Sequence, residues 1–280
     1  MKRTHRIPFL ILLALFLLPV LGWAQLAPFV IISDSHVGAR DSLYLAVIKR
    51  IDEERIRVII HTGDAIDSPG NQKQWATFFE ITGPDKILHH TAGNHDILGQ
   101  RSLETYLTFF PNPYYSVSDK DTLFLFLNTE LPGEEGSVTG QQLAWLTAEL
   151  DKPYRFKFVF LHEPLYPFVP GHGLDRFEEA RDHLHRLFVE KGVSFVASGH
   201  DHVYHRTEKD GIVYVISAAA RKRHRVFLKN GEVRYMVAIR KNDGYAFTVK
   251  NLRGITRDEF SVSGLSFERP QEIKRELMRQ

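Results

Sequence analysis

The stretch FVIISDSH, residues 29–36, places an apolar run directly before two polar side chains, Asp34 and His36. The apolar part, residues 29–33, is typical of a strand that is buried on both faces. The same succession, an apolar run followed by polar groups, recurs four more times along the chain. Because ligands of open α/β sheets bind at the carboxyl ends of the strands, this pattern predicts an α/β fold with one site at the sheet edge.

The four other polar blocks each follow a predicted strand. They are Gly63-Asp64 after residues 57–61, Gly93-Asn94-His95-Asp96 after 86–91, His162 after 156–161, and Gly199-His200-Asp201-His202 after 193–197. The glycines allow the backbone to turn sharply and to come close to a ligand. One such block alone usually reflects turn chemistry or core packing, but five in order indicate that the strand ends converge on a shared site.

Amphipathic runs between these strands predict helices, so that strands and helices alternate. The predicted helices are residues 42–54, 71–81, 103–110, 141–150 and 176–191, and a further strand is expected at 122–128. From about Val203 strand patterns dominate, at 203–205, 212–217, 232–239 and 245–250, with an Asn-Gly turn expected at 229–232. This order predicts a single α/β domain that ends in strands.

The composition limits the chemistry of the site. The 280 residues are 43% hydrophobic and 25% charged, which fits a folded globular protein and excludes a disordered or many-spanning membrane chain. The absence of cysteine excludes disulfides, iron–sulfur clusters, thiolate zinc sites and cysteine nucleophiles. A metal must therefore be held by oxygen or imidazole ligands, which suit zinc, manganese or iron. The blocks offer more ligands than one tetrahedral ion uses, which favours two metal ions.

The N-terminus has the pattern of a secretory signal peptide. Basic residues precede an apolar stretch at 7–21, and Gly22 and Ala24 provide the small residues of a cleavage site. We expect residues 1–24 to direct export, to the periplasm or outside the cell; the alternative is an uncleaved membrane anchor formed by residues 7–24. Without this leader, 33 basic and 34 acidic residues give a net charge of −1, so no nucleic-acid-binding surface is evident.

The blocks D-x-H, G-D, G-N-H-D, H and G-H-x-H, over roughly residues 29–206, resemble those of the calcineurin-like metallophosphoesterases. This resemblance implies a four-layer α/β/β/α sandwich of two mixed β-sheets flanked by helices. We expect it to occupy residues 25–267 and to be followed by a charged tail at 268–280. The resemblance also implies two metal ions, Mn, Fe, Zn or Ni, with Asp34, His36 and His202 on one, Asn94, His162 and His200 on the other, and Asp64 bridging both.

The activity implied by the resemblance is hydrolysis of phosphate mono- or diesters by a metal-bridging hydroxide, with His95 as the acid or transition-state stabiliser. Asp67 stands where the protein-phosphatase branch has an aspartate that pairs with this histidine, although a turn residue before Ser68 is an equal reading. The purple acid phosphatase branch has a metal-binding tyrosine at this position, so a tyrosinate–iron site is not expected. The pattern looks more like the bacterial-type phosphoesterases, which include phosphodiesterases.

The motifs leave several alternatives open. The same site could hydrolyse pyrophosphate bonds of nucleotides or lipids, or the chain could be a catalytically silent metal-binding protein. The small phosphate-ester substrate and the oligomeric state are not fixed by the sequence. His172 lies in a loop after His162 and is either a substrate contact or a surface residue. The basic run at 221–225 could bind an acidic substrate or an anionic headgroup, but we expect it to form a solvated rim. We expect His183 and His185 to face solvent.

Overall fold

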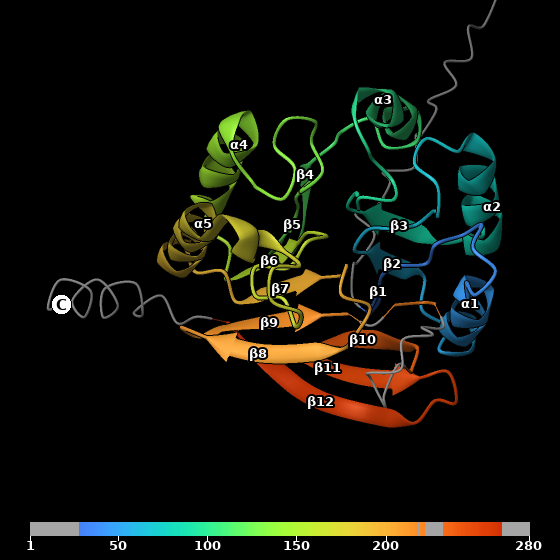
Figure 1. Cartoon of the computed structure of the whole chain (residues 1–280). Coiled ribbons are helices and arrows are strands. Elements are labelled where there is room, and N and C mark those ends of the chain that lie inside the picture. The colour runs from blue at the N-terminus through green and yellow to red at the C-terminus, as the bar shows by residue number, and fades with distance from the viewer. Residues whose placement is uncertain (1–27, 218, 222–231, 265–280) are drawn as a thin grey trace, which may run out of the picture.

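The computed structural model describes residues 28–217, 219–221 and 232–264, and these form two six-stranded mixed sheets flanked by helices (Figure 1). The first sheet has the order β12(Thr256–Ser263), β11(Gly244–Asn251), β10(Arg234–Lys241), β1(Phe29–Ile32), β2(Val58–His61), β3(Ile87–His90). The second has the order β4(Tyr115–Asp119), β5(Thr122–Phe126), β6(Phe156–Phe160), β7(Phe195–Ser198), β9(Ile212–Ile216), β8(His205–Lys209).

The helices cover the outer face of each sheet. The first sheet carries α1(Tyr44–Glu53), α2(Gln72–Thr82) and α3(Gln100–Phe109), and the second carries α4(Gly140–Leu150) and α5(Glu178–Lys191), preceded by the 3₁₀ turn η1(Leu174–Phe177). The apolar alternation of β1 explains the layering, because Phe29 and Ile31 pack between the sheets while Val30 and Ile32 face the helices. The expected four-layer α/β/β/α sandwich is therefore confirmed.

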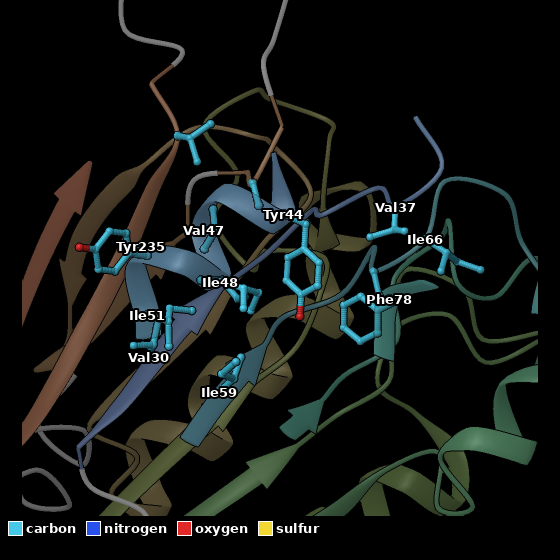
Figure 2. Packing of buried hydrophobic residues seen from close by; sticks show 14 of the residues in the cluster. Val30, Val37, Tyr44, Val47, Ile48, Ile51, Ile59, Ile66, Phe78 and Tyr235 are labelled. Atoms are coloured by element: carbon cyan, nitrogen blue, oxygen red, sulfur yellow. The ribbon is translucent and has the colours of Figure 1, made fainter. Parts of the chain in front are cut away.

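Helix α1 shows how the amphipathic pattern is used. Its buried residues Tyr44, Val47, Ile48 and Ile51 face β1 and β2, and the Tyr44 ring stacks on Phe78 of α2 with a centroid distance of 4.9 Å (Figure 2). This packing fixes the loop between β1 and α1, which contains Asp34 and His36.

The structure differs from the sequence-based expectations at three strands and at one histidine. Strands β4 and β12 were not expected, and β8 begins at His205, where the expected strand 203–205 ends. His185 does not face solvent: it is buried, with Nδ1 2.7 Å from the Tyr214 hydroxyl and Nε2 2.8 Å from Asp210.

Other expectations lie outside the described residues. They are the leader at 1–24, most of the turn at 229–232, residues 222–225 of the basic run and the tail at 268–280. Among the helices that the structure describes, none has the length and apolar character needed to cross a membrane.

Candidate metal centre

The polar blocks meet because their loops are hydrogen-bonded to one another through the main chain. The Asp34 amide donates to the Gly63 carbonyl (2.9 Å), and the His36 amide donates to the Asp64 carbonyl (3.0 Å). The loop after β7 joins in the same way, because the Gly199 amide donates to the His162 carbonyl (3.0 Å). Parallel pairing of β1 with β2 and of β6 with β7 places these loops at the same ends of the strands.

The backbone at the site is strained. Eight described residues other than glycine have positive φ, a region that such residues rarely adopt. Five of the eight belong to the predicted ligand set: Asp34 (51°), His36 (42°), Asp64 (58°), His200 (73°) and His202 (58°). Strain concentrated in this way is typical of functional sites, where the surrounding structure holds side chains in a required direction.

One group of ligand atoms comes from Asp34, His36, Asp64 and His202, whose atoms all lie within 4.8 Å of one another. His36 Nε2 lies 3.1 Å from His202 Nε2 and 3.5 Å from Asp64 Oδ2. His202 Nε2 also lies 3.3 Å from Asp34 Oδ1. The two carboxylates and His36 are buried, so water does not screen their charges.

A second group surrounds His162. Its Nε2 lies 3.2 Å from Asn94 Oδ1, 3.2 Å from His200 Nδ1 and 3.4 Å from Asp64 Oδ1. Asp64 therefore presents one oxygen to each group. All seven predicted metal ligands are thus brought together in two adjoining groups.

The donor set fits divalent cations. His162 Nδ1 lies 2.8 Å from the Thr62 carbonyl oxygen, which can only accept, so Nδ1 donates there and Nε2 faces the group, where it can bind a cation once it has lost its own proton. Several lone pairs then face a common centre, while only one hydrogen bond can form between any two of these nitrogens. Neutral imidazole and carboxylate ligands are those that zinc, manganese and iron accept.

The pKa directions of the ligand groups follow from burial and from the neighbouring charges. Burial lowers the pKa of His36 to about 4 and that of His200 to about 3, so both are neutral ligands at pH 7. Burial also opposes the charged form of Asp64, but the charges and hydrogen bonding of His162 and His36 outweigh it and hold the Asp64 pKa below its ordinary value. For His162 burial is likewise outweighed, and carboxylates led by Asp64 raise its pKa well above normal, so a cation that binds there must displace the Nε2 proton. The centre therefore attracts positive charge.

Asp96 holds Asp64 in place. Its buried carboxylate accepts hydrogen bonds from the amides of Asp64 (2.8 Å), Ala65 (2.9 Å), Ile66 (3.2 Å) and Gly93 (2.9 Å). These bonds tie the loop after β2 to the loop after β3. Sequence reasoning did not assign Asp96 this role, because the four amides belong to segments whose contact becomes apparent only in the fold.

His95 lies beside the ligand groups. Its amide donates to Asp64 Oδ1 (2.8 Å), and its ring meets that of His36 edge-on, with a centroid distance of 4.5 Å. Its Nδ1 lies 2.7 Å from the main-chain oxygen of Asp67, so Nδ1 donates and Nε2 stays available. Asp67 thus contacts His95 through its main chain, whereas the resemblance implied its carboxylate. That carboxylate lies 3.8 Å from His36 Nδ1 and 3.7 Å from Arg221 Nη1.

The loop after β6 also lies against the centre. The His172 ring stacks on that of His200, with centroids 4.2 Å apart, and His172 Nδ1 lies 2.6 Å from the buried carboxylate of Asp201. Asp201 accepts from the Phe168 amide as well (2.6 Å). Of the two readings for His172, the structure favours a place at the site rather than on a plain surface loop.

Comparison with known proteins identifies a family that matches more than half of the chain. Residues 27–204 match the sequence model of the calcineurin-like phosphoesterases. Over 152 residues the chain is 29% identical to purple acid phosphatase 1 of Ipomoea batatas. That match covers 48% of this chain and 32% of the plant protein, so the chain spans about a third of this curated relative.

Two solved structures share the fold. One is GAP50, described as the anchor in the inner membrane complex of Plasmodium, with a TM-score of 0.67, 14% identity, and coverage of 86% of this chain and 89% of that one. The other is a dimetal phosphatase from Danio rerio, with a TM-score of 0.59, 14% identity, and coverage of 86% of this chain and 100% of that one.

Proposed function

The chain belongs to the calcineurin-like phosphoesterase family, and we propose on that premise that it is a metal-dependent hydrolase of phosphate esters. The observation that carries the proposal is the position of Asp64, with Oδ2 in the group of His36 and Oδ1 in the group of His162. A carboxylate placed in this way supports two neighbouring cations. The expected ligands are Asp34, His36 and His202 for one ion, Asn94, His162 and His200 for the other, and Asp64 for both.

Bound metal ions in such a pair polarise a phosphoryl group and lower the pKa of a coordinated water. The protein supplies orientation. Asp96 and the loop hydrogen bonds hold Asp64, and the Thr62 carbonyl holds the His162 ring. His95 is the proposed acid, because its Nδ1 is held by the Asp67 carbonyl and its Nε2 can carry a proton to the leaving oxygen.

We further propose that the protein is exported through the leader at residues 1–24. The support is the basic start, the apolar stretch and the small residues at Gly22 and Ala24. The substrates we propose are small phosphate esters, with nucleotide or lipid pyrophosphates as the second class.

The test is metal content together with hydrolysis by the purified protein. After reconstitution with Mn²⁺, Fe²⁺, Zn²⁺ or Ni²⁺, elemental analysis should find close to two ions per chain, and a panel of monoesters, diesters and pyrophosphates should contain a substrate. Asp64→Asn should lose both metal and activity. His95→Ala should keep the metal and turn over roughly 10²–10⁴-fold more slowly.

His183→Ala is the control, because this exposed histidine lies on α5, outside both ligand groups. It should match the parent in metal content and rate. Full metal occupancy without hydrolysis of any substrate class would reject the enzyme and leave a metal-binding protein. Full activity of His95→Ala would remove His95 from the mechanism.

A further inference from the structure

Arg221 lies beside the candidate metal centre, contrary to the expected solvated rim. The segment before it is fixed to the site, because the Ala220 amide donates to the Ser33 carbonyl (2.9 Å) and the Leu43 amide donates to the Ala220 carbonyl (2.8 Å). The Arg221 side chain is 29% exposed. It is therefore held at the border between the site and solvent, where a ligand could reach it.

The guanidinium is oriented by two carboxylates. Arg221 Nε donates to both oxygens of Asp41, at 2.8 and 2.9 Å, and Nη1 lies 3.7 Å from Asp67 Oδ1. Asp67 is a candidate site residue. Among the ion pairs of the described residues, its pair with Arg221 is the one that joins a candidate site residue to a Lys or an Arg. Arginine suits this place because its planar fork matches the oxygens of a phosphate.

Arg221 places a positive charge next to groups that could otherwise bind a cation. His36, Asp67 and His95 form a further set whose ligand atoms lie within 4.8 Å of one another and which could in principle hold a cation. The fixed positive charge of Arg221, 3.7 Å from Asp67, opposes an additional metal there. A phosphate oxygen near the guanidinium would instead meet its positive charge.

We infer that Arg221 recognises the substrate phosphate and makes the site selective for phosphomonoesters; this rests on the proposed hydrolase function. A monoester dianion has three terminal oxygens, so two can face the ligand groups while the third, still anionic, meets the guanidinium. In a diester that third position carries an alkoxy group, which offers no anionic oxygen. Arg221 therefore stabilises the monoester and contributes little to the diester.

The experiment uses two substrates with the same leaving group, 4-nitrophenyl phosphate and methyl 4-nitrophenyl phosphate, and the metal-reconstituted full chain. Arg221→Gln should lower kcat/KM for the monoester roughly 10- to 100-fold, as expected for a lost charged hydrogen bond, and change the diester value by less than about threefold. It should also weaken binding of inorganic phosphate by a similar factor, measured by calorimetry. For Arg221→Lys, kcat/KM for the monoester should lie between the values of the parent and of Arg221→Gln, because lysine keeps the charge without the planar fork of arginine.

Arg257→Gln is the matched control. Arg257 lies on β12, outside the site, and makes an ion pair with Glu232 (2.7 Å). It should leave both substrates and phosphate binding unchanged. Equal losses on both esters, loss of metal, or unchanged phosphate affinity in Arg221→Gln would overturn the inference and give Arg221 a structural role. A parent protein that hydrolyses neither ester nor any other substrate would instead reject the proposed function.

Discussion

Glycines in the polar blocks decide whether the ligand side chains can approach one another. A Cβ at Gly93 would lie 2.3 Å from Asp64 Oδ1 and 2.5 Å from the Asp64 amide nitrogen. A Cβ at Gly199 would lie 1.9 Å from Ser33 Oγ and 2.8 Å from Asp34 Oδ2. These distances are shorter than any normal contact, so one methyl group at either position must displace a ligand.

Gly93→Ala should therefore displace Asp64 and lose metal from both ligand groups. We expect metal content well below that of the parent and activity at least about 10²-fold lower, because misplaced catalytic groups carry large penalties. Elemental analysis and the rate with an activated ester measure the two effects. Gly211→Ala is the control: its Cβ would meet nothing within 4 Å, and its positive φ costs stability alone, about 1 kcal/mol. Parent-like metal content in Gly93→Ala would contradict the argument.

Individual residues were predictable where their type and place follow from one block. The seven candidate ligands stand directly after strand patterns, so the sequence alone places each of them at the carboxyl end of a strand. Asp96, Asp201 and Arg221 were not assigned their contacts, because their partners come from loops far away in the chain. The contact of His95 with the main-chain oxygen of Asp67 could not be predicted either, because every residue type has this oxygen.

At the scale of elements, the strands that the sequence failed to place are edge strands. β4, β8 and β12 each end a sheet, and β8 and β12 are largely exposed and charged. An edge strand needs less apolar surface, and charged side chains also protect it from pairing with other chains. The alternation that reveals a buried strand is therefore weak in these segments, whereas β1, β2, β6 and β7 were predicted from their apolar runs.

Lys157 links three elements and offers a test at this scale. It lies in the buried strand β6, between Phe156 and Phe158, which pack between the sheets. Its Nζ donates to the carbonyls of Leu150 (2.5 Å) and Lys191 (2.9 Å), the last residues of α4 and α5. A positive charge at the C-termini of two helices donates hydrogen bonds to free carbonyls and interacts favourably with the negative ends of the helix dipoles.

Lys157→Met should lower the free energy of unfolding by about 1–3 kcal/mol, because two carbonyls lose a charged donor while the apolar stem is retained. Urea unfolding of the metal-free protein measures the change. Lys152→Met is the matched control at an exposed ion pair with Glu149 and should change stability by less than about 1 kcal/mol. Equal effects of the two exchanges would show that the contacts of Lys157 contribute nothing beyond a surface charge.

In the whole molecule, the site exists only when both sheets are docked. β1, β2 and β3 supply Asp34, His36, Asp64 and Asn94, and the loops after β6 and β7 supply His162, His200 and His202. The interface between the sheets is largely aromatic, with Phe29, Phe124 and Phe158 among its residues. Because the unfolded chain has no such ligand set, bound metal should stabilise the fold as a whole.

Three histidines behind the site make the fold sensitive to acid. His61 and His90 are opposite one another on β2 and β3, with rings stacked at 5.1 Å, and His89 stacks on Phe126 at 5.2 Å. Burial lowers the pKa of His61 to about 3 and that of His89 to about 4, and it holds the pKa of His90 well below its ordinary value. These side chains stay neutral in the fold while the unfolded chain takes up protons.

The unfolding free energy of the metal-free protein should therefore fall as the pH is lowered from about 6.5 toward 4. Below the unfolded pKa of about 6.5 the unfolded state binds protons that the folded state does not, until the folded pKa near 4 is reached. His89→Phe keeps a ring on Phe126 but cannot be protonated, so its loss between pH 7.5 and 5 should be smaller by roughly 1–2 kcal/mol. Urea unfolding with a chelator present measures both curves. His183→Phe makes the same exchange at an exposed position and should leave the pH dependence of the unfolding free energy unchanged. Parallel curves for His89→Phe and the parent would show that His89 is not the source of the acid sensitivity.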